Sequence, residues 1–121
     1  MKISPRLAHV LRDTILGLVR QDAPDLTARQ LATLLVCCLE DGPHTMSGLA
    51  ERLGVSRPVI TRAADRLVEF GFVKRVDDAR DRRSVLLEVT ASGRLYVEEL
   101  KAIMVAAAVA DMSAEVLTGT G

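Results

Sequence analysis

Residues 49–71, LAERLGVSRPVITRAADRLVEFG, constrain the fold more than any other part of the sequence. One helical pattern ends at Gly54, which permits a tight turn, and a second pattern begins almost at once. Ser56 has the side chain of a good N-cap, and Pro58 suits the first turn of the helix that follows. Ile60 falls on the inner face of that helix. The segment predicts a helix–turn–helix.

Two further helical patterns precede this pair. Ser4-Pro5 predicts the cap and first turn of a first helix, because the missing N–H of proline costs little there. Thr27 and Gln30 form a capping box that begins a second helix, which Gly42-Pro43 ends. The first helix has apolar or small side chains at spacings of three and four, namely Leu7, Val10, Leu11, Thr14, Ile15 and Leu18.

The chain after Gly71 predicts a hairpin and a long helix. Residues 72–76 and 85–89 are typical of strands, and the polar segment DDARDRRS forms the tip between them. Thr90 begins the last helix, and the tail after Met112 is expected to fray. The order of elements therefore predicts a mainly α fold with a small β-hairpin wing, which is a winged helix–turn–helix.

The charge is unevenly distributed although the net charge is zero. Residues 1–44 hold five basic and five acidic side chains, and residues 84–121 hold two basic and five acidic ones. Residues 45–83 hold nine basic and six acidic side chains, so the helix–turn–helix and hairpin lie in the positive segment. A local positive field of this kind favours a polyanion as the binding partner.

The second helix of the pair is the element expected to lie in the major groove of duplex DNA. An arginine on its outward side can bind O6 and N7 of guanine, and a threonine can donate to a phosphate. Arg62 is the expected contact to a base edge or an adjacent phosphate. The full set expected to contact DNA is Arg57, Pro58, Val59, Thr61, Arg62, Arg66, Arg80, Arg82 and Arg83.

The hairpin is expected to extend the DNA contact, because arginines at its tip suit the narrow, negative minor groove. Arg83 is the residue predicted to reach that groove. Asp65 is predicted to hold Arg75 or a wing arginine in place, a structural role of modest energy if the pair is exposed. Asp81 is predicted to orient Arg83, because a phosphate would repel its carboxylate.

Other reactive side chains have ordinary interpretations. Cys37 and Cys38 are adjacent, which is a poor disulfide geometry, and apolar neighbours favour core packing over redox sensing. His9 and His44 lack a metal-ligand spacing, and no catalytic constellation is present, so we expect no metal, no cofactor and no enzymatic activity. With no apolar run long enough to cross a bilayer and no signal-peptide pattern, the sequence predicts a cytoplasmic protein.

Two stretches resemble the multiple-antibiotic-resistance (MarR) family of transcriptional regulators. LAERLGVSRPVITRAADRLVEFGFVKR, residues 49–75, resembles the paired helices of the family and the approach to its wing. DARDRRSVLLEVTASG, residues 78–93, contains the Asp-x-Arg wing motif as Asp81-Arg82-Arg83 and the start of the next helix. Val59 stands where the family often has Thr or Ser, and Gly48 where it often has Glu.

The resemblance implies a homodimeric DNA-binding regulator, usually a repressor of a nearby operon. It also implies that the N- and C-terminal helices form the dimer, with one final helix and a tail here in place of the usual last pair. We expect a single domain over residues 1–121. Residues 27–90 form its DNA-binding winged helix, and residues 1–22 and 91–112 form the dimerisation helices.

Two functions of different classes are consistent with these residues. The first is a sequence-specific transcriptional regulator, a repressor that binds an inverted-repeat operator as a homodimer. The second is a non-enzymatic winged-helix module that docks on another protein, such as an antagonist that dimerises with a regulator. The basic outward helix face favours the first. The residues identify no small-molecule effector, and an aromatic content of 2% argues against a large aromatic-lined pocket for one.

Overall fold

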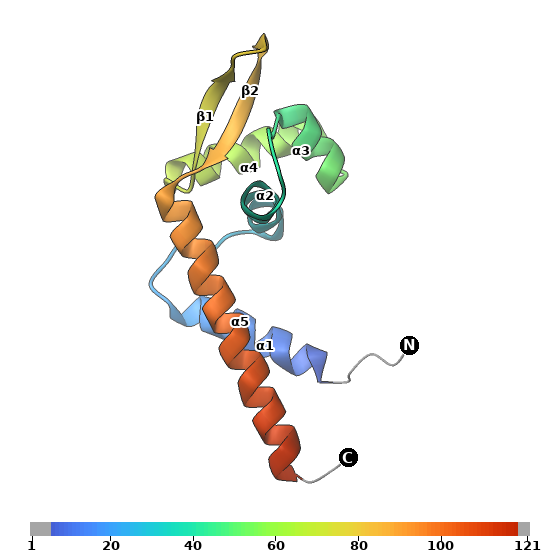
Figure 1. The fold of residues 1–121 in the computed structure, drawn as a ribbon, viewed down its shortest axis with the longest axis vertical. Coiled ribbons are helices and arrows are strands. Elements are labelled where there is room, and N and C mark those ends of the chain that lie inside the picture. The colour runs from blue at the N-terminus through green and yellow to red at the C-terminus, as the bar shows by residue number, and fades with distance from the viewer. Residues whose placement is uncertain (1–5, 119–121) are drawn as a thin grey trace. The chain divides into compact units, whose positions relative to one another are not determined.

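The computed structural model describes residues 6–118, with side chains up to residue 114 (Figure 1). The Ser4-Pro5 cap predicted from sequence lies outside these residues. The chain forms two compact units, which we call the winged unit, residues 26–97, and the helical unit, residues up to 25 and from 98 onward. The last helix, α5 (Ala91–Thr118), begins in the winged unit and continues through the helical unit. It extends past Met112, where the sequence predicted a frayed tail.

The helical unit packs α1 (Leu7–Arg20) directly against α5. A Cβ atom built on Gly17 would lie 2.6 Å from Cγ2 of Ile103, so the two helices approach too closely there for a larger residue. The guanidinium Nε of Arg6 donates to Oδ1 of Asp111 at 2.7 Å, which joins residues 105 positions apart in the chain. Gly17 therefore permits the close approach of α1 to α5, and the ion pair of Arg6 with Asp111 connects the two helices.

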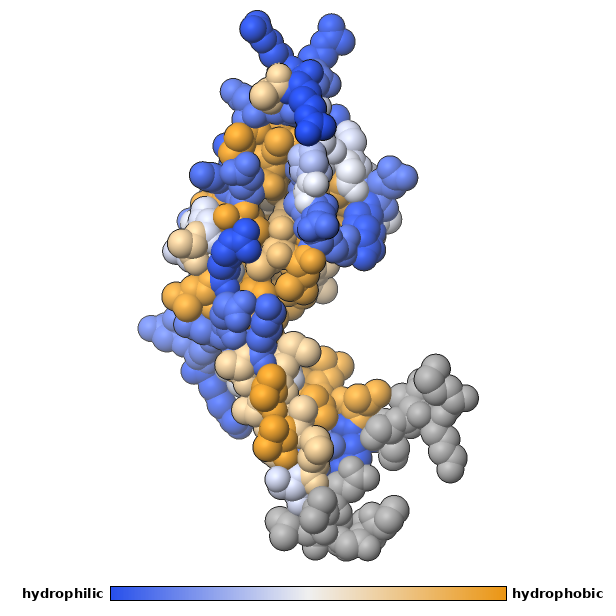
Figure 2. Space-filling view, in the orientation of Figure 1, coloured by the Kyte–Doolittle hydropathy of each residue, from blue (hydrophilic) through white to orange (hydrophobic). Residues whose placement is uncertain are grey.

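Much of the apolar surface of the helical unit remains exposed. Leu11 on α1 is 62% exposed and Val105 on α5 is 62% exposed, values far from those of a covered core. Figure 2 shows apolar side chains on the surface of these helices. The exposed large apolar residues of this unit are Leu7, Leu11, Ile15, Leu16, Val19, Met104, Val105, Val109 and Met112. The helical unit of one chain therefore leaves a broad apolar surface uncovered.

The winged unit is built on three helices, α2 (Ala28–Leu39), α3 (Met46–Leu53) and α4 (Arg57–Glu69). The predicted capping box starts α2: Oγ1 of Thr27 accepts from the amide of Gln30, and Oε1 of Gln30 accepts from the amide of Thr27. The core is mainly aliphatic, and Phe72 and Tyr96 are its buried aromatic side chains. Its fully buried large side chains are Leu34, Leu49, Ile60, Leu67, Val73, Leu87 and Val97.

The hairpin consists of antiparallel strands β1 (Val73–Asp78) and β2 (Asp81–Val89). The sequence predicted that residues 77–84 form the tip, and this prediction was wrong, because β1 continues to Asp78 and β2 already begins at Asp81. Next to the turn, Asp78 lies opposite Asp81. One residue further from the turn on β1, Asp77 lies opposite Val85, so the register of the two strands shifts between Asp77 and Asp78. The turn needs few residues because nearby carboxylates accept hydrogen bonds from its backbone amides, as described below.

The start of α5 is fixed to the base of the hairpin. The hydroxyl of Thr90 donates to the carbonyl of Gly71 at 2.5 Å, and the amide of Thr90 donates to the carbonyl of Phe72 at 3.0 Å. A Cβ atom on Gly93 would lie 2.1 Å from that same Phe72 carbonyl oxygen. The first turn of the helix thus crosses the hairpin base at a distance that only glycine permits. The ring of Phe72 in turn packs on Tyr96, with centroids 4.9 Å apart.

Candidate nucleic-acid interface

The turn between α3 and α4 is set by Gly54, which has a φ of 70°. Its amide donates to carbonyls at the end of α3, and the amide of Val55 donates to the carbonyl of Ala50 at 3.0 Å. Ser56 is the N-cap of α4, as the sequence predicted, but its hydroxyl makes no capping hydrogen bond. The exposed Ser56 hydroxyl therefore remains available at the start of α4.

Helix α4 has one buried face and one exposed face. Its buried side chains are Ile60, Ala63, Ala64 and Leu67. Its exposed side chains are Arg57, Pro58, Thr61, Arg62, Asp65, Arg66 and Glu69, while Val59 is half-buried. The hydroxyl of Thr61 donates to the carbonyl of Arg57 at 3.1 Å, so that proton is already used inside the helix. The outward face of α4 thus presents three arginines, a proline and a threonine, together with the carboxylates of Asp65 and Glu69.

Two basic side chains of the helix–turn–helix are neutralised inside the chain. Arg52 forms a two-pronged ion pair with Glu40, at 2.9 and 2.7 Å, and this hydrogen-bonded guanidinium lowers the pKa of the Glu40 carboxyl. Arg66 pairs with Glu69 at 2.5 Å and lies over the ring of Phe70, 4.7 Å from its centroid. Both arginines are therefore partly committed to intramolecular contacts.

Two basic side chains of β1 are also paired. Arg75 forms an ion pair with Asp65, which connects β1 to the outward face of α4. Lys74 lies 3.9 Å from Glu88, its cross-strand partner in the hairpin. Asp65 and Arg75, for which the sequence predicted a supporting role, are thus brought together by the fold.

Five arginines of the same segment have no such partner. Within residues 6–114, no carboxylate lies within ion-pair distance of any of them. They are Arg57 and Arg62 on α4, Arg80 in the hairpin turn, and Arg82 and Arg83 on β2. All five side chains are exposed. The unneutralised positive charge of the helix–turn–helix and hairpin is therefore concentrated on these arginines.

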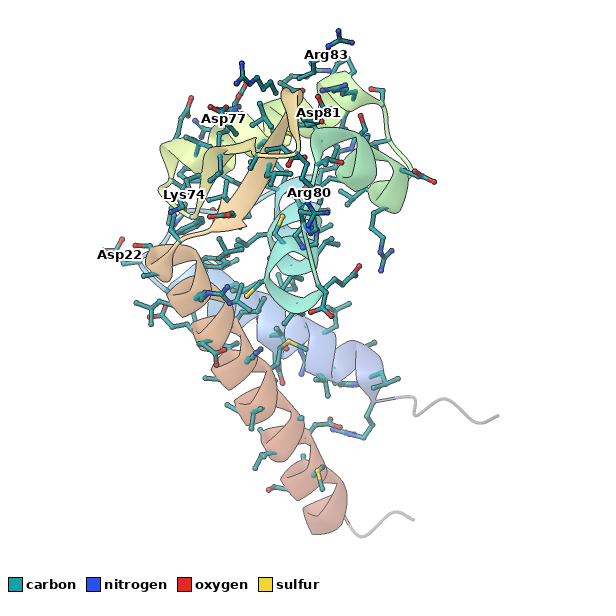
Figure 3. All side chains as sticks on the ribbon, turned by 45° about the horizontal axis from the view of Figure 1, so that its top comes forward. Asp22, Lys74, Asp77, Arg80, Asp81 and Arg83 are labelled. Atoms are coloured by element: carbon teal, nitrogen blue, oxygen red, sulfur yellow. The ribbon has the colours of Figure 1, made fainter. Side chains whose placement is uncertain are left out.

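The carboxylates of the hairpin shape its backbone. Oδ1 of Asp78 accepts from the amide of Arg80 at 2.9 Å, and Oδ1 of Asp81 accepts from the amide of Arg83 at 2.9 Å. Asp81 also accepts from the hydroxyl of Ser84 through Oδ2, at 3.3 Å. Asp81 therefore fixes the backbone of Arg83, while Arg80 and Arg83 leave the hairpin in different directions (Figure 3).

A cavity of about 240 Å³ lies between the hairpin and the helix–turn–helix. Arg57 from the first turn of α4 and Arg83 from β2 both line it, although they are far apart in sequence. Its other lining residues are Thr45, Met46, Ser47, Asp81, Ser84 and Val85. The fold thus brings an arginine of α4 and an arginine of the hairpin to one recess.

A second cavity, of about 270 Å³, lies between the start of α2 and the outward face of α4. It is lined by Arg29, Arg62 and Arg66, and we call it the arginine groove. The sequence analysis did not predict a role for Arg29, because Arg29 lies outside the helix–turn–helix and the hairpin. The sequence feature that could have indicated Arg29 is its position in the first turn of a helix with a clear capping box.

The thiols and acidic side chains of the described residues form no cluster of metal ligands. Burial raises the pKa of the Cys37 thiol to about 11, and the adjacent Cys38 contributes to the same shift. Across residues 6–114, His, Cys, Asp and Glu form no group of three that could hold a metal ion. In the same part of the chain, no helix combines the length and apolar character needed to span a bilayer.

A helix–turn–helix, a charged hairpin packed beside it and unpaired arginines on both define a winged-helix DNA-binding protein. Residues 26–85 match the MarR family, which covers the helix–turn–helix and most of the hairpin. The chain belongs to the MarR family of non-enzymatic transcriptional regulators, as its two sequence motifs predicted.

Individual relatives agree with this placement. The chain is 30% identical over 104 residues to the HTH-type transcriptional repressor NicR of Pseudomonas putida, a match that covers 81% of this chain and 65% of NicR. It is 33% identical over 61 residues to the HTH-type transcriptional regulator YcgE of Bacillus subtilis, covering 50% of this chain. That match spans only 40% of YcgE, so the chain corresponds to less than half of this relative.

The fold is also that of a solved regulator. The MepR–DNA complex of S. aureus superposes with a TM-score of 0.74, covering 93% of this chain and 90% of that one, at 22% identity. At this identity the likeness concerns the fold alone. It confirms the predicted mainly α winged helix–turn–helix with a two-stranded hairpin.

Proposed function

We propose that this chain is a sequence-specific, cytoplasmic transcriptional repressor that binds an inverted-repeat operator as a homodimer. The observation that carries the proposal is the set of five exposed arginines without a carboxylate partner in the described chain, on α4 and the hairpin of one unit. Free guanidinium groups on a major-groove helix are suited to guanine edges and phosphates. NicR, a relative over most of the chain, is named as a repressor.

The proposed roles differ between the two elements. Arg62, which lies on the exposed face of α4 without an ion-pair partner in the described chain, reads a base edge or an adjacent phosphate. Arg83, held by its own backbone bond to Asp81, enters the minor groove. Asp65 and Arg75 hold the hairpin against α4. The contact surface is completed by Arg57, Pro58, Val59, Thr61, Arg66, Arg80 and Arg82.

The helical unit supplies the dimer in this proposal. Its exposed leucine, valine and methionine side chains on α1 and α5 form a surface that a second copy would cover. Two-fold symmetry would place the two recognition helices about 34 Å apart, so the half-sites would be centred about ten base pairs apart. The winged unit would then bind DNA while the helical unit sets the spacing.

The experiment is a selection of bound duplexes from a random library, followed by titration of the selected site. We expect an inverted repeat, and we expect Arg62→Ala to lose about 1–3 kcal/mol per half-site and to relax preference at one or two positions. Arg83→Ala should weaken binding to many sequences and lower the salt dependence. Arg94→Ala, an exposed arginine at the start of α5, is the control.

A different outcome would favour the second class of function. If no duplex is enriched, and Arg62→Ala and Arg83→Ala both bind DNA as the wild type does while staying folded and dimeric, the chain does not recognise DNA through this surface. A winged helix that docks on another regulator would then be the better account.

A further inference from the structure

The arginine groove contains a positive side chain that belongs to neither the helix–turn–helix nor the hairpin. Arg29 lies in the first turn of α2 and lines the groove together with Arg62 and Arg66 of α4. The remaining lining residues are Thr27, Gln30, Val59 and Ala63, so no carboxylate of the described chain lines the groove. Its charged lining is therefore entirely basic.

The backbone that carries Arg29 is firmly held. Its neighbours Thr27 and Gln30 close a reciprocal cap, with hydrogen bonds of 3.0 and 3.2 Å. The carbonyl of Arg29 itself accepts from the hydroxyl of Thr33, a fully buried residue, at 2.8 Å. Among the residues that line the groove, Arg29 is the one charged residue that α2 contributes.

The three arginines are not equally free. Arg66 is paired with Glu69 and stacked on Phe70, which uses part of its hydrogen-bonding capacity. Arg29 and Arg62 are exposed, and no acidic side chain of the described chain lies within ion-pair distance of either. Two guanidinium groups from different helices, lining one recess without a counter-charge, are suited to a phosphate, whose oxygens accept such forked donors.

We propose that Arg29 binds a backbone phosphate of the DNA next to the segment that α4 reads. This inference rests on the proposed function and adds α2 as a third DNA-contacting element beside α4 and the hairpin. A phosphate contact fixes register and contributes affinity but does not discriminate between bases. Arg62, shared between the groove and the outward face of α4, would then connect phosphate binding to base recognition.

The test compares the full-length wild type with Arg29→Gln and, as a matched control, Arg94→Gln, which removes another exposed arginine that lies outside the groove. Each protein is titrated against a selected site and an unrelated duplex at four salt concentrations. A plot of log affinity against log salt concentration has a negative slope. For Arg29→Gln we expect this slope to become shallower by about 0.9 for each phosphate that the variant no longer neutralises. The affinity should decrease by the same factor on both duplexes. Arg94→Gln should keep the wild-type slope.

Failure of this inference is distinguishable from failure of the proposed function. If the wild type binds no duplex, the proposed function fails. If the wild type binds and Arg29→Gln keeps its slope and affinity, only the Arg29 contact is refuted. A changed base preference in Arg29→Gln would also overturn the phosphate assignment, because base reading would then be its role.

A free anion is the other source of the same chemistry. Thermal unfolding without DNA is therefore measured in phosphate and in chloride at equal ionic strength. We expect the wild type and Arg29→Gln to respond alike. A midpoint that phosphate raises in the wild type alone, together with an unchanged salt slope on DNA, would assign the groove to a free anion and overturn the DNA contact.

Discussion

Arg75 on the first strand of the hairpin pairs with Asp65 on the outward face of the recognition helix. The two residues are ten positions apart in sequence, and the turn at Phe70-Gly71 brings them together. The pair connects the hairpin to α4, and each of its two exposed charges is balanced by the other. It orders the interface more than it stabilises the fold, since both side chains remain well exposed.

The small stability contribution of this pair can be measured with a double-mutant cycle of Asp65→Asn and Arg75→Gln. We expect a coupling free energy of about 0.2–1 kcal/mol in urea unfolding at fixed protein concentration, decreasing at high salt, because an exposed ion pair is screened by water and ions. A coupling above about 2 kcal/mol would show that the pair is more buried in solution than its exposure indicates.

Gly93 should be intolerant of substitution. In Gly93→Ala the new methyl group would meet the Phe72 carbonyl, so the first turn of α5 must move away from the hairpin base. We expect the free energy of unfolding to fall by about 1–3 kcal/mol or more, as measured by denaturant unfolding. Ser92→Ala, at the exposed neighbouring position, should stay within about 0.5 kcal/mol of the wild type. Equal stability of the two variants would contradict the close approach.

The thiol of Cys37 should make stability depend on pH in the alkaline range. Its pKa is about 11 in the folded chain against an ordinary 9.0, so the folded state keeps a proton that the unfolded state loses. The stability due to the neutral thiol is therefore complete below pH 9.0 and is lost as pH rises toward 11.

Cys37→Ala tests this dependence. Urea unfolding at several pH values should show a smaller alkaline loss of stability in Cys37→Ala than in the wild type. Cys38→Ala should keep most of the wild-type loss, because burial is the larger cause of the raised Cys37 pKa. The double variant should retain DNA binding, apart from a packing cost of about 1–3 kcal/mol. Release of DNA on peroxide treatment that disappears in the double variant would instead identify an oxidation sensor.

The exposed apolar surface of the helical unit predicts self-association. Sedimentation of the wild type at micromolar concentration should give about twice the chain mass of 13.1 kDa. Leu11→Glu and Val105→Glu each place a charge on this surface, and both should shift the protein toward the monomer. Lys101→Glu, at an exposed polar position of the same helix, is the control. A wild type that stays monomeric and folded on dilution would contradict the proposed dimer.

Local chemistry explains which parts of the fold were predictable from sequence. The capping box of Thr27 and Gln30 and the turn at Gly54 depend on residues close together in the chain, and the structure forms both. The early start of β2 was missed because the segment DDARDRRS, in which seven of the eight residues are polar, resembles a loop. The decisive factor there is a pair of short-range hydrogen bonds, in which the amides of Arg80 and Arg83 donate to the carboxylates of Asp78 and Asp81 and make a tight turn possible.

The proposed site shows the same limit. Composition could indicate that residues 45–83 are basic, but it could not indicate which cations are already neutralised. That depends on partners such as Glu40 for Arg52, twelve positions away, and Asp65 for Arg75. The place of Arg29 beside Arg62 was also beyond the sequence, because it depends on how α2 packs against α4.

The arginines without partners have a consequence for how this regulator could change over generations. Because Arg57, Arg62, Arg80, Arg82 and Arg83 are exposed and form no ion pair within the described chain, replacing them removes no internal contact of that kind. Substitutions at such surface positions usually change stability by less than about 0.5 kcal/mol. Single mutations at these arginines can therefore change the DNA preference while the free energy of unfolding stays above the value that folding requires. Duplicated copies of such a gene could acquire new operators without first acquiring extra stability.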